Sequence, residues 1–264
     1  RSRERYILVT DPGPDPDDVK ALLVLAMLDL QREIDLIAVV ANGGGHARDR
    51  AALARCLLDH VGATHVPVGI GSEGTVHPPG PYEFQLEGYE NADRGALEPG
   101  PALIRRALAA SPPRSVTLVC ISALTDAADV MRSEPDLVMS RVREVGIQGG
   151  LERVRDSFGE PVKGGPASGQ WVPDTSVNNV FDMDAAAFVY RFCFDRALPM
   201  AVVSRHAVPM LPMQLARSFA LRSTCPVMTY LADAQFRGLE GLWQKLCEGA
   251  LPPRCTRQWY FETF

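Results

Sequence analysis

Residues 6–19 read Tyr6-Ile7-Leu8-Val9-Thr10-Asp11-Pro12-Gly13-Pro14-Asp15-Pro16-Asp17-Asp18-Val19. The apolar start is typical of a buried strand, and the apolar spacing from Val19 to Ala26 predicts a helix. The turn between them is stiffened by prolines and a glycine, and it carries four carboxylates. In an α/β sheet such a turn lies at the carboxyl end of a strand, where ligands usually bind. This stretch therefore predicts a strand–turn–helix unit and, at its turn, a candidate site.

The four acids of the turn repel one another unless a cation or shared protons relieve the repulsion. An oxygen-rich turn without Cys or His suits a hard ion, Ca²⁺ or Mg²⁺. It is not an EF-hand loop, because the alternate-residue ligands and the terminal Glu are missing. The alternative is an acidic N-capping turn on a solvated helix, since Asp is a preferred cap. Because four acids exceed what a cap needs, we favour a metal or catalytic role.

The alternation of strand and helix continues along the chain. The sequence predicts further strands at 34–40, 66–70, 116–120, 142–147 and 200–203, and helices at 47–61, 102–110, after Asp126 and at 185–194. This order predicts an α/β fold, a doubly wound and mainly parallel sheet with helices on both faces. No domain boundary is visible, so we expect one domain over residues 1–264. We also expect an ordered surface loop or lid at 71–100 and a mobile stretch at 151–173.

The composition argues against several classes of function. The net charge of −5 over 264 residues gives no electrostatic footprint for nucleic acid. No apolar run approaches the roughly 20 residues of a membrane span. The six cysteines form no CxxC pair, so we expect reduced thiols in a reducing compartment and no zinc site. The glycine-rich motifs of dinucleotide-binding and P-loop proteins are absent from the sequence.

The other predicted strands also end in small or polar clusters. Asn42 and three glycines follow the strand at 34–40, Ile121-Ser122 follows the strand at 116–120, and Gln148-Gly149-Gly150 follows the strand at 142–147. The carboxyl ends of parallel strands lie along one edge of a sheet. These clusters and the acidic turn can therefore line a common pocket.

Several ordered pieces of the chain, between about Tyr6 and Met210, resemble the inosine-uridine-preferring nucleoside hydrolases. The pieces are Asp11-Pro12-Gly13 with Asp17-Asp18, similar to the family's DPGxDD motif with two residues inserted; Asn42, similar to its strand-end asparagine; TLVCISALTD at 117–126, similar to TLVxxGPLTN; GQWVPDTSVN at 169–178, aligned on GNVTPAAEFN; and Asp182. Within the family, the chain resembles in particular the nucleoside-hydrolase-like type III effectors of plant-pathogenic bacteria. That resemblance implies secretion into the host cytoplasm and host proteins as further partners.

The resemblance implies a Ca²⁺ ion held at the sheet edge by Asp11, Asp18 and the backbone carbonyl of Ile121. It implies that Asp17 is the general base of an N-ribosyl hydrolase with an oxocarbenium-like transition state. The two inserted residues leave open whether Asp15 is a metal ligand in place of Asp17 or Asp18.

Two asparagines are the implied ribose-binding residues. By the resemblance, Asn42 and Asn178 hold the ribose hydroxyls. An isolated Asn is about equally often a turn-forming or strand-capping residue, and the alignment shifts that balance toward the site.

The departures from the family pattern suggest a different ligand. Gln170 and Ser176 stand where the family has an asparagine and a glutamate on the ribose 5′ side. Loss of the glutamate removes a charge that would repel a 5′-phosphate, so we infer a 5′-substituted ligand such as ADP-ribose. Arg153 and Arg155 could meet its negative charge, although Arg is more often a solvated surface residue.

The last metal ligand of the family, an Asp preceded by His, has no counterpart after His206. Either the chain continues beyond Phe264 or the site lacks that carboxylate. Three functions stay open from the sequence: a metal-dependent hydrolase of a nucleoside or nucleotide derivative, a module that captures a ribosyl ligand with little turnover, and a protein recognised by host partners.

Overall fold

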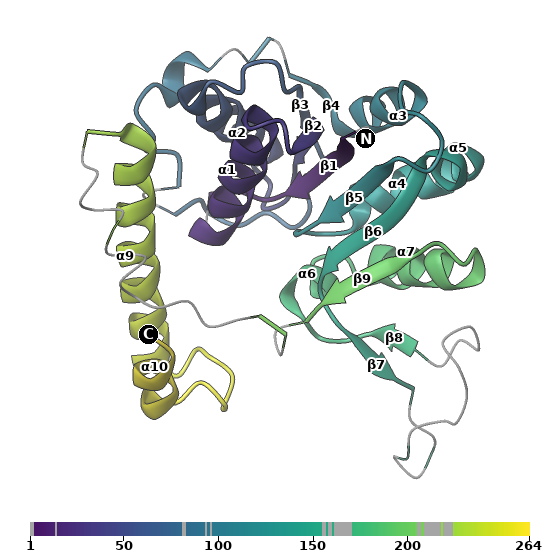
Figure 1. Ribbon diagram of the computed structural model, residues 1–264. Coiled ribbons are helices and arrows are strands. Elements are labelled where there is room, and N and C mark those ends of the chain that lie inside the picture. Colours follow the sequence, from purple (N-terminus) through teal and green to yellow (C-terminus); the bar gives the residue numbers. More distant parts are fainter. Residues whose placement is uncertain are drawn as a thin grey trace.

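The computed structural model (Figure 1) describes residues 3–13, 15–80, 83–92, 94–95, 97–154, 157, 160, 171–204, 207–208, 218 and 224–264. A seven-stranded sheet lies at its centre in the order β4-β3-β2-β1-β5-β6-β9, and every pairing in this sheet is parallel. The strands are β1 Glu4–Thr10, β2 Ile34–Ala41, β3 Val68–Ile70, β4 Glu98–Pro99, β5 Val116–Cys120, β6 Val142–Gln148 and β9 Met200–Val203. The predicted parallel sheet is confirmed.

Helices cover both faces of this sheet (Figure 1). They are α1 Pro16–Leu30, α2 Ala47–Val61, α3 Gly100–Ala109, α4 Thr125–Ser133, α5 Pro135–Arg141, α6 Val177–Val180, α7 Met183–Asp195, α9 Pro226–Cys247 and α10 Arg257–Thr263. Alternation along β1 divides the core, because Leu8 packs with α1, α2 and α9, whereas Ile7 and Val9 pack with α3, α4, α5 and α7. This arrangement confirms the doubly wound α/β fold.

The β1–α1 unit follows directly from its sequence. Pro16 occupies the first helical position, where its missing N–H costs nothing. Val19, Leu22 and Ala26 recur at helical spacing and are fully buried against the sheet. The short acidic turn is thereby fixed at the carboxyl end of β1.

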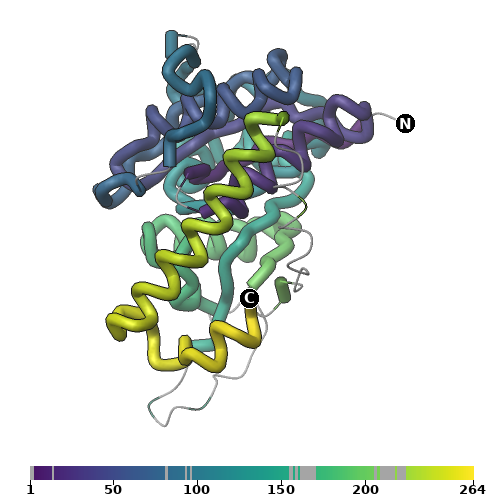
Figure 2. Tube along the Cα trace, turned by 90° about the vertical axis from the view of Figure 1, so that its left-hand side faces the viewer, coloured from purple at the N-terminus to yellow at the C-terminus, as the bar shows by residue number. Residues whose placement is uncertain are grey.

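The two C-terminal helices, α9 and α10, lie outside the predicted elements. The 22-residue α9 packs against α1 and α2 through Val227, Tyr230 and Leu231. Figures 1 and 2 show α9 passing across the side of the molecule toward which the central strands point. The helix therefore adds a wall beyond the carboxyl ends of the strands.

A small hairpin replaces part of the stretch that we expected to be mobile. Strands β7 Leu151–Arg153 and β8 Trp171–Pro173 pair in antiparallel fashion, so the two ends of the stretch form regular structure that the sequence did not predict. The guanidinium of Arg153 lies 5.2 Å from the centre of the Trp171 ring. Between 71 and 100 the described residues are mostly irregular, with a 3₁₀ turn at Tyr89–Asn91, which agrees with a surface loop.

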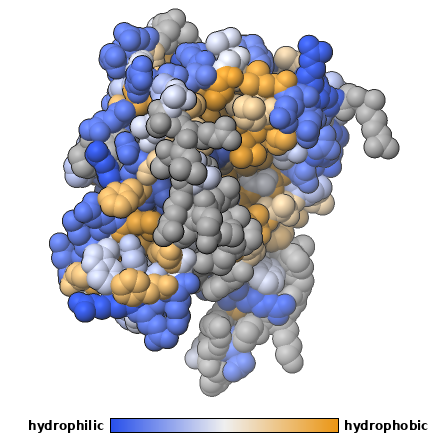
Figure 3. All heavy atoms as spheres, turned by 60° about the vertical axis from the view of Figure 1, so that its left-hand side comes forward, coloured by the Kyte–Doolittle hydropathy of each residue, from blue (hydrophilic) through white to orange (hydrophobic). Residues whose placement is uncertain are grey.

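The outer surface of α1 keeps several apolar side chains. Val24 is 57% exposed and Met27 is 44% exposed. Figure 3 shows hydrophobic atoms gathered in the upper part of this side of the molecule, framed by hydrophilic ones. Among the helices that the structure describes, none combines the length and apolar character that crossing a membrane requires.

Candidate functional site

A cavity of about 670 Å³ opens at the carboxyl ends of the central strands. Its walls come from the β1–α1 turn, the ends of β2, β5 and β6, the loop after β3, helices α2, α6 and α9, and Phe264 after α10. Of the residues predicted for the site, the lining includes Asp11, Asp15, Asp17, Asp18, Asn42, Ile121 and Asn178. The strand ends thus bring together clusters that are far apart in the sequence, as a parallel sheet requires.

The acidic turn does not serve as a side-chain cap for α1. Asp15 occupies the N-cap position, but its carboxylate makes no capping hydrogen bond. Asp18 instead points back to β1, where the Thr10 hydroxyl and the Asp11 backbone N–H donate to its Oδ1, the latter over 3.1 Å. Both Asp11 and Asp18 are buried. A side-chain cap therefore accounts for neither Asp15 nor Asp18.

Burial of these carboxylates shifts their protonation. Loss of water raises the pKa of Asp11 to about 9; repulsion from Asp18 adds to this rise, and attraction to Arg50 opposes it. Burial also raises the pKa of Asp18 to about 7, with repulsion from Asp17 as the next cause. The pKa of Asp15 is raised by burial and by Asp17, while Lys245 opposes that rise. A bound cation would stabilise the charged forms of these groups.

Arg50 is a buried cation within the cavity wall. Its Nη1 lies 3.4 Å from Asp11 Oδ2 and donates over 3.0 Å to the Asn42 carbonyl, and its Nε donates over 3.2 Å to Glu83 Oε1. Gly44, at a φ of +70°, passes so close that an added Cβ would lie 2.7 Å from the guanidinium. Arg50 thus joins the acidic turn, the end of β2 and the loop after β3.

Asn42 presents an unpaired acceptor at the end of β2. Its Nδ2 donates over 2.8 Å to Asp126 Oδ2 and over 3.2 Å to the Ala123 carbonyl. Its Oδ1 is buried and has no hydrogen-bond partner among the described residues. Such an acceptor suits a hydroxyl donor or a cation, because leaving it unpaired is costly.

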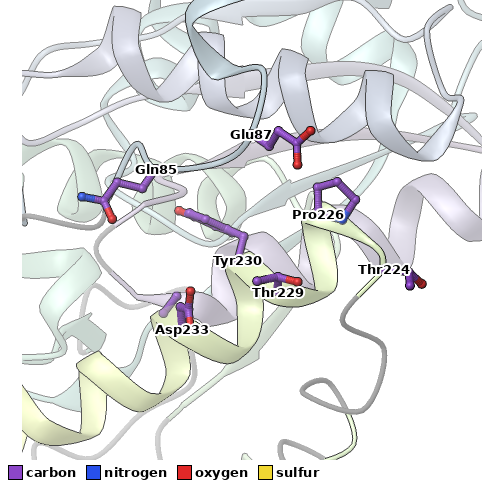
Figure 4. Close-up of a pocket in the computed structure, with 8 residues that line it drawn as sticks. Gln85, Glu87, Thr224, Pro226, Thr229, Tyr230 and Asp233 are labelled. Carbon is purple, nitrogen blue, oxygen red and sulfur yellow. The ribbon is translucent and has the colours of Figure 1, made fainter.

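The α9 wall is held to the loop after β3 by Tyr230. Figure 4 shows the Tyr230 ring directed from α9 toward the segment that carries Gln85 and Glu87. The Tyr230 hydroxyl donates over 2.7 Å to the Glu83 carbonyl. A smaller cavity of about 280 Å³ lies beside this contact. Because Glu83 also binds Arg50, α9 is connected through it to the acidic turn.

Comparison with known proteins identifies the family of this chain. Residues 6–247 match the family of the inosine-uridine preferring nucleoside hydrolases. The chain belongs to this family. Comparison with curated sequences gave no match.

Among solved structures, two effector proteins are similar to this member of the nucleoside hydrolase family. The chain is 28% identical to the type III effector protein XopQ, solved in complex with adenosine diphosphate ribose, with a TM-score of 0.80 over 100% of this chain and 74% of that one. The effector protein XOO4466 gives the same identity and TM-score, with 73% of its chain covered. The inosine-uridine preferring nucleoside hydrolase from Bacillus anthracis, at 16% identity, TM-score 0.62 and coverage of 88% and 75%, shares the fold.

Among the residues assigned through the family motif, Asn178 and Ile121 are in direct contact. Asn178 Nδ2 donates over 2.8 Å to the Ile121 carbonyl and over 3.2 Å to the Gln148 carbonyl, so it links the ends of β5 and β6. A carbonyl oxygen has two lone pairs, so Ile121 retains one for a further partner. The two residues therefore fit a role at the site, and that role stays a prediction.

The residues predicted for the 5′ side lie away from the cavity lining or outside the described residues. Ser176 precedes α6, and its buried hydroxyl has no partner within the described part of the chain. Arg153 is exposed over Trp171 and does not line the cavity. Gln170 and Arg155 lie outside the described residues.

The oxygen atoms that line the cavity are of the type that binds a hard cation, but the described side chains are not grouped as in a metal site. The turn offers carboxylate oxygens, with the Ile121 carbonyl in the same lining, which is the ligand type of Ca²⁺. Within the described ranges, however, no three side chains of His, Cys, Asp or Glu are grouped closely enough to hold a metal ion. The four carboxylates line the same cavity, but they do not converge on a common position.

Three charged lining residues were absent from the predicted site: Arg50, Glu83 and Lys245. Arg50 and Glu83 meet only through the tertiary fold, because α2 and the loop after β3 are brought together there. Lys245 reaches the cavity from α9, which was not predicted. Its helical spacing relative to Gly238 and Gly241 is the one signal in the sequence that could have placed it.

Proposed function

We propose that this protein is a nucleoside-hydrolase-like effector whose cavity binds a ribosyl ligand substituted at the 5′ position, such as ADP-ribose. The observation that carries the proposal is the pairing of buried carboxylates of raised pKa with the unpaired Oδ1 of Asn42. Such groups attract a cation and hydroxyl donors, which together match a ribose bound through a metal ion. The similarity to XopQ, solved with adenosine diphosphate ribose, supports the choice of ligand.

We assign Ca²⁺ to Asp11, Asp18 and the Ile121 carbonyl, with Asp15 and Asp17 beside them. When bound, calcium supplies a positive charge that attracts the ribose hydroxyls and makes a nearby water easier to deprotonate. The high pKa values of Asp11 and Asp18 support the assignment, since both carboxylates gain from a neighbouring cation.

The residues of the chain then have separate roles in hydrolysis. Asp17 lines the cavity at the start of α1 and is assigned as the base that accepts a proton from the attacking water. Asn42 accepts a hydrogen bond from a ribose hydroxyl through its free Oδ1. The negative charges of the turn stabilise the ribosyl cation as the N-glycosidic bond breaks.

Calorimetry and chromatography together test this proposal. The purified protein with Ca²⁺ is titrated with inosine, uridine, AMP and ADP-ribose, and released base or ribosyl product is followed by chromatography. We expect binding of ADP-ribose, and product release that is lost in Asp17→Asn, which keeps the shape of the side chain. If none of the four ligands binds at millimolar concentration, the proposed function is wrong.

A second candidate function is ligand capture without turnover. It is favoured by Arg50, whose buried charge already lies 3.4 Å from Asp11 and competes with a metal ion for that carboxylate. Tight binding of ADP-ribose without any released product, in the wild type and in Asp17→Asn alike, would support capture over hydrolysis.

We also propose export by a type III system into a host cell, where host proteins would be further partners. The two effectors of 28% identity support this proposal. A pull-down from host lysate with the double variant Asp11→Ala, Asp18→Ala separates the roles. Partner binding should survive loss of the acids, whereas ribosyl-ligand binding should not.

A further inference from the structure

We propose that Lys245 forms an anion subsite on the α9 wall, where its ammonium group binds the phosphoryl part of the ligand, an assignment that rests on the proposed ribosyl ligand. The acids of the β1–α1 turn would then hold the ribose end, and α9 would hold the charged 5′ end. No residue of α9 was among those predicted for the site.

The geometry of α9 provides an open surface for such a group. Gly238, Gly241, Leu242 and Lys245 line the cavity. They are spaced by three and four residues, so they share one face of the helix. Among the described residues, no heavy atom lies within 4 Å of a Cβ added at Gly238 or Gly241. This face therefore has room for an extended ligand that passes along it toward Lys245.

The distribution of charge in the cavity selects Lys245 over other cations. Arg50 and Lys245 are the Arg and Lys side chains in the described lining. Arg50 is buried and already bound to Asp11 and Glu83. Lys245 is exposed and makes no ion pair within the described part of the chain, although its charge acts on Asp15. Among the Arg and Lys side chains of the described lining, an entering phosphate therefore finds Lys245 outside any ion pair.

The position of Lys245 also explains how an acidic cavity could accept an anion. Phosphate oxygens close to the turn would be repelled by its carboxylates. Lys is a flexible point charge that suits phosphate without demanding one orientation. A ligand whose phosphates lie along α9 keeps them beside Lys245 and presents its ribose hydroxyls to the turn.

The test compares matched ligands on matched variants. Calorimetry with adenosine, AMP and ADP-ribose is performed on the wild type, Lys245→Ala, Lys245→Arg and the control Lys20→Ala. Lys20→Ala is the charge control: Lys20 does not line the cavity but hydrogen-bonds the lining residue Gln235 over 2.6 Å, so its loss should affect the three ligands alike. We expect Lys245→Ala to weaken ADP-ribose and AMP by roughly tenfold, as for a hydrogen bond to a charged group, and to leave adenosine within twofold. Lys245→Arg should retain most of the affinity.

The remaining outcomes separate this assignment from the proposed function. If Lys245→Ala leaves the preference for the phosphorylated ligands unchanged, the subsite is wrong while the ribosyl function stands. Equal weakening of adenosine and ADP-ribose would also overturn the subsite, because Lys245 would then act only on the acidic turn. If the wild type binds none of the three ligands, the proposed function fails and the subsite fails with it.

Discussion

Arg50 shows how one side chain can organise a site without belonging to its motif. It is buried between Asp11 and Glu83 and also binds the carbonyl of Asn42. Its charge opposes the rise in the pKa of Asp11 and so favours the ionised form of that carboxyl group. Removing Arg50 would leave the buried Glu83 side chain without its ion-pair partner and the Asn42 carbonyl without a donor, which is costly.

We therefore expect Arg50→Met to lower the free energy of unfolding by about 3–5 kcal/mol, the cost typical of breaking a buried ion pair. Urea unfolding at pH 7 measures this change. The control Arg191→Met removes an exposed i,i+4 pair with Asp195 and should cost less than about 1 kcal/mol. Equal costs for the two variants would show that Arg50 does not have this role.

The acidic turn also predicts how stability depends on pH without metal. Asp11 and Asp18 have pKa values of about 9 and about 7 in the folded protein, above the ordinary value of 3.8. Above about pH 4 the unfolded chain releases protons that the folded protein keeps, so the stability present at low pH is lost as pH rises toward 7 and 9. We expect the melting temperature in EGTA to fall between pH 5 and pH 9, and Asp18→Asn to make this fall shallower. A melting temperature that rises over the same range would contradict the assignment.

Calcium should reverse that trend. Proton release from Asp11 and Asp18 at higher pH creates the charged form that a cation binds. At pH 8 and a calcium concentration about 100 times its Kd, we expect a gain of about 2.7 kcal/mol in the free energy of unfolding. The gain should be much smaller at pH 5 and absent in Asp18→Asn. Thermal unfolding with and without calcium measures it, and equal effects on wild type and variant would indicate non-specific binding.

At the scale of single residues, the sequence located the side of the cavity that the strand ends form. Asp11, Asp18, Asn42 and Asn178 could be placed because each follows a strand or belongs to a recognisable motif. The ties of Arg50 to Glu83 could not, because nothing local in α2 distinguishes a buried arginine from an exposed one. Such a pairing depends on the approach of two segments that only the tertiary structure brings together.

At the scale of secondary structure, α9 is the main addition to the predicted fold. Its buried residues Val227, Tyr230, Leu231 and Ala234 recur at helical spacing after Pro226, so the helix had a readable signal. The pattern is short, and in its second half, which lines the cavity, two glycines interrupt it. Glycine within a helix is unfavourable, which hides such a helix from propensity arguments.

Those glycines lead to a prediction about the stability of α9. Because a Cβ at Gly238 or Gly241 meets no described atom, Gly238→Ala and Gly241→Ala should each raise the free energy of unfolding by about 0.5–1 kcal/mol. Gly100→Ala in α3 is the contrast, since its Cβ would lie 2.5 Å from Val40 and should destabilise the protein. Chemical denaturation distinguishes the two. A loss of stability in both α9 variants would mean that this face is not open.

At the scale of the whole molecule, the protein is a layered α/β body with the long helix α9 attached beside the carboxyl ends of its central strands. The sheet and its two cores follow from the alternation of apolar strands and helices, which is why the architecture could be predicted. The attachment of α9 depends on a few contacts instead, among them the Tyr230 hydroxyl on the Glu83 carbonyl.

We expect Tyr230→Ala to release α9 while the sheet stays folded. Hydrogen exchange should accelerate across residues 226–247 and stay unchanged in β1, β2 and β5, because the lost packing is local. The control Phe236→Ala, on the same helix but 71% exposed, should leave both unchanged. Faster exchange in the central strands of Tyr230→Ala would show that α9 and the sheet unfold as one unit.

The walls of the cavity come from distant parts of the chain, the turn at 11–18 and helices within 226–264. During synthesis on a ribosome the carboxylates therefore emerge well before the wall that faces them. The nascent chain can pair the strands of its central sheet before α9, which completes the cavity, has been made. The lining of the cavity is therefore complete only after residues 226–264 have been synthesised, so translation sets the earliest moment at which this cavity can exist.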